Sequence, residues 1–345
     1  HGIATAAGPT TDACFLYRIE TLLPAQEHPI TAARWDWLSL GVSYHLLGQP
    51  DRARDIILPF LNALMTKNKV NDSQESLMFL ARAMMLINEK EQAHKISLRI
   101  SDCSSKLYNL MDVTKQALWN GNTVEARQYA DQARDYVEDN QCSWQKSIVA
   151  QALKLTAREA EGKKLYELIE GEQFNNVRNE NRDENTPPEL AVAAASMGEP
   201  ETALNILRVV MEQNPWTISA AIEELGKRGE FDSSEAFIND LKELDQKAEA
   251  LATLVETAIK RNDSKRAAAI MAKLNALRAS PSVPDQQALI LAMRARAEKD
   301  LYKDERWRDT MQTALNTADL VEENKRSQVA LPLIATLAYI KTGKP

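Results

Sequence analysis

The stretch WLSLGVSYHLLGQPDRA, residues 37–53, reads as one helix, a tight turn and the start of a second helix. Its large apolar residues recur every three or four positions, which is the period of a single helix face. Gly48 follows, and glycine adopts the left-handed backbone that commonly ends a helix. Ala53 stands five residues later and is small enough to let the two helices cross closely. The stretch therefore predicts a helix-turn-helix unit.

The same turn recurs along the chain. Gly or Asn occupies the turn position, and a small residue follows five positions later at most copies. The turn residues are Gly8, Gly48, Asn88, Gly121, Gly198, Gly229 and Asn262. One degenerate copy is expected between the turns at Gly121 and Gly198, with Gly162 as its turn and Glu167 as its anchor. The units then average about 36 residues, a length typical of helix-turn-helix repeats.

Most other apolar stretches share the helical period, and sustained β-branched alternation is absent. The chain has 345 residues with only 11 Gly and 13 Pro, which argues against an all-β protein because many turns consume both residues. We therefore predict an all-α chain that forms an α-solenoid, a superhelix of about eight helix-turn-helix repeats.

Trp37, Leu40, Gly41 and Tyr44 reproduce the pattern W-x2-L-G-x2-Y. This stretch resembles the tetratricopeptide repeat (TPR) family, whose signature has that spacing. Later copies keep the sizes of these residues rather than their identities. The resemblance implies a TPR-like superhelix whose first helices line a concave groove, and it implies a non-catalytic scaffold or adaptor.

Two blocks of repeats are expected, residues 1–171 and 189–345, separated by a polar loop or hinge at 172–188. The chain starts at a turn that leads into a second helix, and it ends at a turn that follows a lone first helix. Two interpretations fit a sequence that starts and ends in the middle of a repeat: a segment cut from a longer solenoid, or a solenoid that ends on a capping helix.

The resemblance also implies which positions of the first helices contact a ligand. Aromatic and cationic side chains at these positions suit an extended or helical peptide that carries an acidic group. The candidate binding residues are Trp35, His45, Arg82, Tyr108, Lys115 and Trp119. The alternative is that Trp35 and Trp119 pack against neighbouring repeats, as aromatic residues at helical spacing commonly do. The same positions in later repeats hold Glu223, Lys227, Glu256 and Lys260. We do not predict these residues to bind a ligand.

Motifs for catalysis are missing from the sequence. The four His form no metal-binding pair, and no phosphate-binding glycine loop or nucleophile elbow occurs. We expect no catalytic residue, no metal and no cofactor. Neighbouring carboxylates such as Glu223 and Glu224 are interpreted as a solvated face. Two alternatives remain: an enzyme with carboxylates in a helical-repeat cleft, or a regulatory domain of a larger protein that senses a peptide or small ligand.

The formal net charge is −7, which argues against nucleic-acid binding because that task needs a basic surface. No apolar run approaches 18 residues, so no transmembrane segment is expected. The partner is therefore expected to be a protein or peptide. The first residue is His1 rather than Met, which indicates a processed or excised chain. A cytoplasmic location and a periplasmic or secreted one after signal removal both stay open, as does the oligomeric state.

The chain has three cysteines, Cys14, Cys103 and Cys142, without the paired spacing of a zinc site. They allow at most one disulfide. Three buried or free thiols are the favoured interpretation, and a bond between Cys103 and Cys142 stays open.

Overall fold

A computed structural model describes residues 12–23, 35–66, 74–139, 142, 145–169, 188–210, 215–278 and 283–342. Within these ranges the chain forms 18 α-helices and one short 3-10 helix, and it forms no strand. The predicted all-α class is confirmed. The superhelix and its number of repeats stay predictions.

Contacts divide the chain into two compact units. Unit 1 contains residues 1–71 and 238–345, and unit 2 contains residues 72–237. The predicted loop at 172–188 lies outside the described residues except for Pro188. The prediction of two repeat blocks on either side of it stays a prediction.

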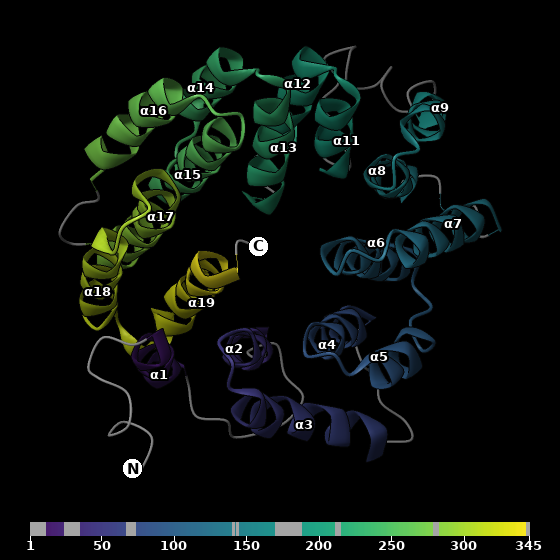
Figure 1. The fold of residues 1–345 in the computed structure, drawn as a ribbon, viewed down its shortest axis with the longest axis horizontal. Coiled ribbons are helices and arrows are strands. Elements are labelled where there is room, and N and C mark those ends of the chain that lie inside the picture. The colour runs from purple at the N-terminus through teal and green to yellow at the C-terminus, as the bar shows by residue number, and fades with distance from the viewer. Residues whose placement is uncertain are drawn as a thin grey trace. The chain divides into compact units, whose positions relative to one another are not determined.

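Unit 2 is built from helix pairs that follow one another in sequence (Figure 1). Within each pair the two helices pack together, and the first helices of successive pairs also pack together, as α4 does on α6 and α11 on α13. The helices are α4 (Gln74–Leu86), α5 (Lys90–Ser97), α6 (Cys103–Trp119), α7 (Thr123–Asp139), α8 (Lys146–Leu155), α9 (Glu159–Ile169), α11 (Glu189–Met197), α12 (Pro200–Val210) and α13 (Pro215–Arg228). Helix α14 (Phe231–Asp240) crosses the boundary between the units.

Unit 1 combines the first and last described helices of the chain. In sequence order it contains α1 (Asp12–Leu22), α2 (Trp35–Leu46), α3 (Pro50–Thr66), α15 (Leu244–Lys260), α16 (Ser264–Ala276), α17 (Pro284–Tyr302), α18 (Arg306–Ala318), the 3-10 helix η4 (Glu323–Lys325) and α19 (Arg326–Thr342). Helix α19 packs against α17, α2 and α1 (Figure 1). No second helix follows α19 among the described residues, and α1 lies against it instead.

The predicted turns share one backbone geometry. At the first turn, Gly48 N donates to His45 O over 2.9 Å and Gln49 N donates to Tyr44 O over 2.9 Å. This pair of bonds satisfies carbonyls that the helix end leaves open, and it needs a positive φ at the turn residue. Positive φ occurs at Gly48 (78°), Asn88 (66°), Gly121 (75°), Gly198 (91°), Gly229 (93°) and Asn262 (62°). The six predictions are confirmed, and the seventh, Gly8, lies outside the described residues.

The degenerate copy was placed in the wrong register by the sequence. Ala157 is the turn residue there, with φ 62°, and Gly162 lies inside α9. Gly162 instead occupies the small position five residues after the turn. A Cβ at Gly162 would stand 2.6 Å from Ala150 O, so only glycine allows α8 and α9 to approach this closely. The turn was assigned to the wrong residue because turns were identified by Gly or Asn, and an alanine with positive φ carries neither mark.

Gly41 of the signature stretch has the same role in unit 1. A Cβ there would stand 2.6 Å from Cγ1 of Ile57 on α3. Leu40 and Tyr44 are buried beside it. The motif is thus explained by the close packing of α2 on α3.

A disulfide joins Cys103 to Cys142, with 6.3 Å between their Cα atoms. That distance is within the range that a disulfide spans. The favoured interpretation of three thiols was therefore wrong, and the pairing left open is the one found. The bond links the first residue of α6 to the segment before α8, because α7 folds back along α6. Cys14 is half-buried on α1.

Candidate functional site

Three of the predicted binding residues line one shallow groove of unit 2. Arg82 comes from α4, whereas Lys115 and Trp119 come from α6. Its volume is only about 10 Å³, room for about one water molecule. The complete lining is Arg82, Met85, Leu86, Asp112, Val113, Lys115, Gln116 and Trp119. A hollow this small does not enclose a small molecule.

Helical periodicity explains why these side chains converge. Arg82 and Met85 are three residues apart on α4, and Asp112, Lys115 and Trp119 are three or four apart on α6. Residues at that spacing share one face of a helix. Because α4 and α6 pack side by side, the two faces form the two walls of the groove.

The two cations of the groove differ in their surroundings. Arg82 Nε lies 3.7 Å from Asp112 Oδ2, and the Arg82 side chain is 42% exposed. An ion pair this open to solvent contributes about 0–1 kcal/mol, so Arg82 is only weakly held. Among the residues that the structure describes, no ion pair or hydrogen bond engages the half-buried Lys115 side chain. Lys115 is therefore available to an anionic group of a ligand.

Gln116 and Asp112 were missed by the sequence reasoning, which considered only the expected contact positions. Gln116 Oε1 is buried at the groove and accepts no hydrogen bond from the described residues. A buried polar atom without a hydrogen-bond partner costs free energy. The available signal was their helical spacing from Lys115 and Trp119.

Tyr108 does not line this groove. Its hydroxyl donates to the Glu189 carboxylate on α11. Its ring packs on the apolar cluster around Leu107 and Met111. Burial raises the pKa of the Glu189 carboxyl. Tyr108 therefore joins neighbouring helices within unit 2.

Trp35 and His45 belong to unit 1, at the first residue and the last turn of α2. The Trp35 side chain lies outside the described residues. His45 is half-buried, and burial together with the nearby Arg54 lowers its pKa. The structure thus places the six candidates in two separate units.

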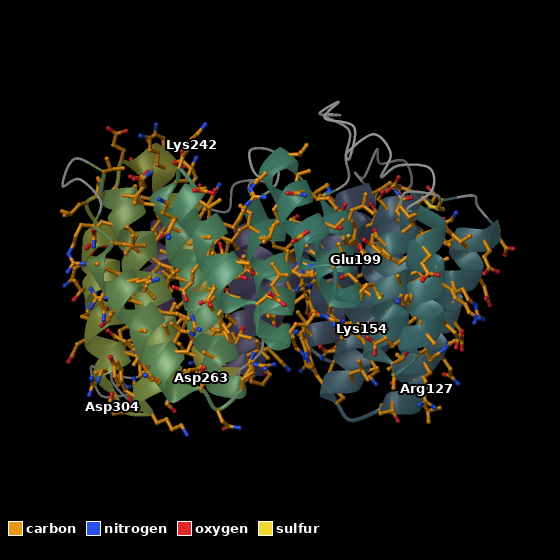
Figure 2. All side chains as sticks on the ribbon, turned by 90° about the horizontal axis from the view of Figure 1, so that it is seen from above. Arg127, Lys154, Glu199, Lys242, Asp263 and Asp304 are labelled. Carbon is orange, nitrogen blue, oxygen red and sulfur yellow. A yellow bond between two sulfur atoms is a disulfide. The ribbon has the colours of Figure 1, made fainter. Side chains whose placement is uncertain are left out.

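A second group of charges in unit 2 is engaged within the fold. Lys154 Nζ, labelled in Figure 2, donates to Ser196 O over 2.7 Å and to Glu224 Oε2 over 3.0 Å. Glu224 also accepts from Lys227 over 2.7 Å. Although burial opposes it, these two lysines lower the pKa of Glu224. The carboxylate interpreted as part of a solvated face instead pairs with Lys154, and the two side chains together link α8, α11 and α13.

Unit 1 contains a buried polar cluster that we define as Glu256, Arg296, Asp300 and Tyr339. Both carboxylate oxygens of Glu256 face the Arg296 guanidinium, with 2.8 Å between Arg296 Nη2 and Glu256 Oε2. The guanidinium carbon lies 4.2 Å from the centre of the Tyr339 ring. Tyr339 Oη donates to Asp300 Oδ2 over 3.1 Å. The polar cluster joins α15, α17 and α19.

The polar cluster was also missed, because its arginine is 40 residues from its carboxylate. Burial raises the pKa of Glu256, and Arg296 opposes that effect. Arg296 shares a face of α17 with the buried Ala292 and Met293, and a charge on such an apolar face is a usable signal for a buried ion pair.

No group of His, Cys, Asp and Glu suited to a metal ion occurs within the described ranges. In the same part of the chain, no helix combines the length and apolar character needed to cross a membrane. Comparison of the chain with known protein families and with curated proteins gives no match.

Proposed function

We propose that this chain is a non-catalytic, TPR-like scaffold that binds an extended segment of a partner protein. The partner segment lies along the α4–α6 groove of unit 2 and carries an acidic group. The observation that supports this most is the convergence of Arg82, Lys115 and Trp119 on one groove from two helices.

Each part of the groove suits one part of such a segment. Lys115 and the weakly held Arg82 attract a carboxylate. Trp119 and Met85 offer an apolar wall of the kind on which binding energy concentrates. A shallow groove with these groups matches an extended chain, which buries few atoms at any one place.

The alternative of an enzyme needs carboxylates that can reach a substrate. Among the described residues of unit 1, the most buried carboxylate, Glu256, is engaged by Arg296 on both oxygens. A carboxylate held in this way stabilises the helix stack, and this favours the scaffold over a carboxylate-based hydrolase.

The test uses two defined peptide libraries of about ten residues, in which a chain can lie extended over about 33 Å. One library has a single central Asp or Glu among apolar residues, and the other has Asn or Gln at that position. Immobilised full-length protein is expected to retain the acidic library preferentially. Lys115→Glu should abolish the preference, because it replaces the attracting charge with a repelling one.

Lys163→Glu is the matched control, since it makes the same charge change on the exposed Lys163 of α9. It should leave retention unchanged. Equal retention of both libraries, or equal losses in both variants, would contradict the proposal. Thermal unfolding of the two variants separates a loss of binding from a loss of structure.

A further inference from the structure

The pairing of α1 with α19 differs from the other helix pairs of unit 1. In α2–α3, α15–α16 and α17–α18, the second helix directly follows the first along the chain. The partner of α19 is instead α1, from the other end of the sequence. Helix α1 also reaches the end of α18, where Arg18 contacts Asp319, 301 positions away. Helix α1 is therefore paired with a helix that is not its neighbour in the sequence.

Helix α1 docks through one apolar face. Phe15, Leu16 and Ile19 are buried on this face, whereas Tyr17 on the other side is 61% exposed. The Phe15 ring lies 6.2 Å from that of Trp307 on α18. This is the pattern of an amphipathic helix bound in an apolar groove.

Charged contacts at both edges fix the position of α1. Arg18 Nη2 pairs with Asp319 Oδ2 over 2.5 Å, at the end of α18. Glu20 accepts from Tyr44 Oη of α2 over 2.6 Å and pairs with Arg52 of α3. We define Tyr44, Arg52, Trp307, Asn316 and Asp319 as the α1-binding surface. Asn316 belongs to it because its Oδ1 accepts from Arg18 over 3.1 Å.

One group of this surface stays unsatisfied when α1 is bound. Trp307 is 1% exposed, and its Nε1 donates no hydrogen bond to the described residues. A buried donor without an acceptor costs free energy, and this cost is the same whether α1 comes from the same copy or from a second one.

We propose that the α1-binding surface is an exchangeable helix-binding site whose partner is the α1 of a second copy of this chain. The complementarity needed is already present, because the face, the ring contact and both charged edges involve this same sequence. Each copy then donates α1 to the other, which is a symmetric exchange and the simplest route from a monomer to a closed dimer. This proposal is independent of the groove in unit 2.

The test uses two full-length variants with reversed charges. The helix variant carries Arg18→Glu and Glu20→Arg, and the surface variant carries Asp319→Arg and Arg52→Glu. In each variant alone, both edges of its own α1 meet like charges. When the two variants are mixed, both exchanged helices meet opposite charges.

Light scattering is expected to give the mass of one copy for each variant alone and of two copies for the equimolar mixture. The mixed pair should associate at least about tenfold more tightly than either variant with itself. A mixture that keeps the mass of one copy, with both variants folded by circular dichroism, overturns the proposal.

A second measurement covers variants that fail to fold. A fluorescent peptide of residues 9–24 is titrated into the unaltered chain up to millimolar concentration, which is the effective concentration of a tethered segment. Fluorescence anisotropy should rise, and a control peptide with Phe15→Asp should give no rise. No rise with the unaltered peptide, or equal rises with both peptides, overturns the proposal.

Discussion

The groove of unit 2 and the polar cluster of unit 1 use the same predicted position of a first helix in opposite ways. Arg82 and Lys115 hold this position in unit 2, and Glu256 holds it in unit 1. Arg82 is 42% exposed beside Asp112, whereas Glu256 and Arg296 are 4% and 16% exposed and contact each other closely. The shared position therefore determines only that the charged side chain lies on one face of its helix. The neighbouring helix decides whether that charge stabilises the fold or faces a ligand.

The largest effect is expected from breaking the buried pair. Arg296→Ala leaves the Glu256 carboxylate buried and uncompensated, so the free energy of unfolding should fall by about 3–5 kcal/mol. Arg82→Ala removes an exposed pair and should change it by about 1 kcal/mol or less. Urea titrations of both variants measure the contrast.

The double variant Arg296→Met with Glu256→Leu sharpens the same comparison. Replacing both charges by apolar residues of similar volume should cost less than removing the arginine alone. Equal losses for Arg296→Ala and Arg82→Ala would show that the two regions do not differ in this way.

The disulfide is expected to have the next largest effect. Cys103→Ser with Cys142→Ser opens a loop with a sequence separation of 39 residues. The unfolded state then gains freedom, which should lower the stability of unit 2 by about 2–4 kcal/mol. Thermal unfolding with and without a reducing agent measures this in the unaltered chain. An unchanged transition in the reduced protein would argue that the bond contributes nothing to the groove helix α6.

The corrected register of unit 2 makes two opposite predictions. Gly162→Ala should destabilise by about 1–3 kcal/mol, because its Cβ would press against Ala150 O. Ala157→Gly should stabilise by about 1 kcal/mol, because it removes a side chain from a residue with positive φ. Chemical denaturation of both variants decides the register. The reverse signs would support Gly162 as the turn.

The smallest effect is expected at His45 in unit 1. Burial and Arg54 lower its pKa in the folded state, so the unfolded state binds the proton more readily. Its contribution to stability is then complete above the unfolded value of about 6.5 and is lost as the pH falls below it. His45→Asn should flatten the dependence of the unfolding temperature between pH 5 and 7. A dependence that is equally steep in the variant would contradict this assignment.

Much of the fold is readable from the sequence, since six predicted turns carry the expected positive φ. These turns are local, and Gly or Asn marks each of them. The sequence does not reveal Ala157 as a turn, because alanine rarely takes that conformation. It also does not pair α1 with α19 or Cys103 with Cys142, because those contacts join distant segments.

The candidate site was predictable to the extent that repeat register determined it. Arg82, Lys115 and Trp119 converge as the register predicts. Tyr108 has the right register, but its hydroxyl contacts Glu189 of another helix. The neutralisation of Glu256 depends on an arginine two helices further on. Register therefore predicts the helix face on which a side chain lies. The residue that this side chain contacts depends on tertiary packing.

The most direct test of the central claim is a charge exchange between the groove and its ligand. An acidic peptide retained by the unaltered protein is compared with the same peptide in which the acid is replaced by Lys. Lys115→Glu should weaken the acidic peptide about tenfold or more, about 1.4 kcal/mol, and should strengthen the lysine peptide. The unfolding temperature of Lys115→Glu should equal that of the control variant Lys163→Glu. Equal affinities of both proteins for both peptides would contradict the claim that Lys115 is directed at a ligand.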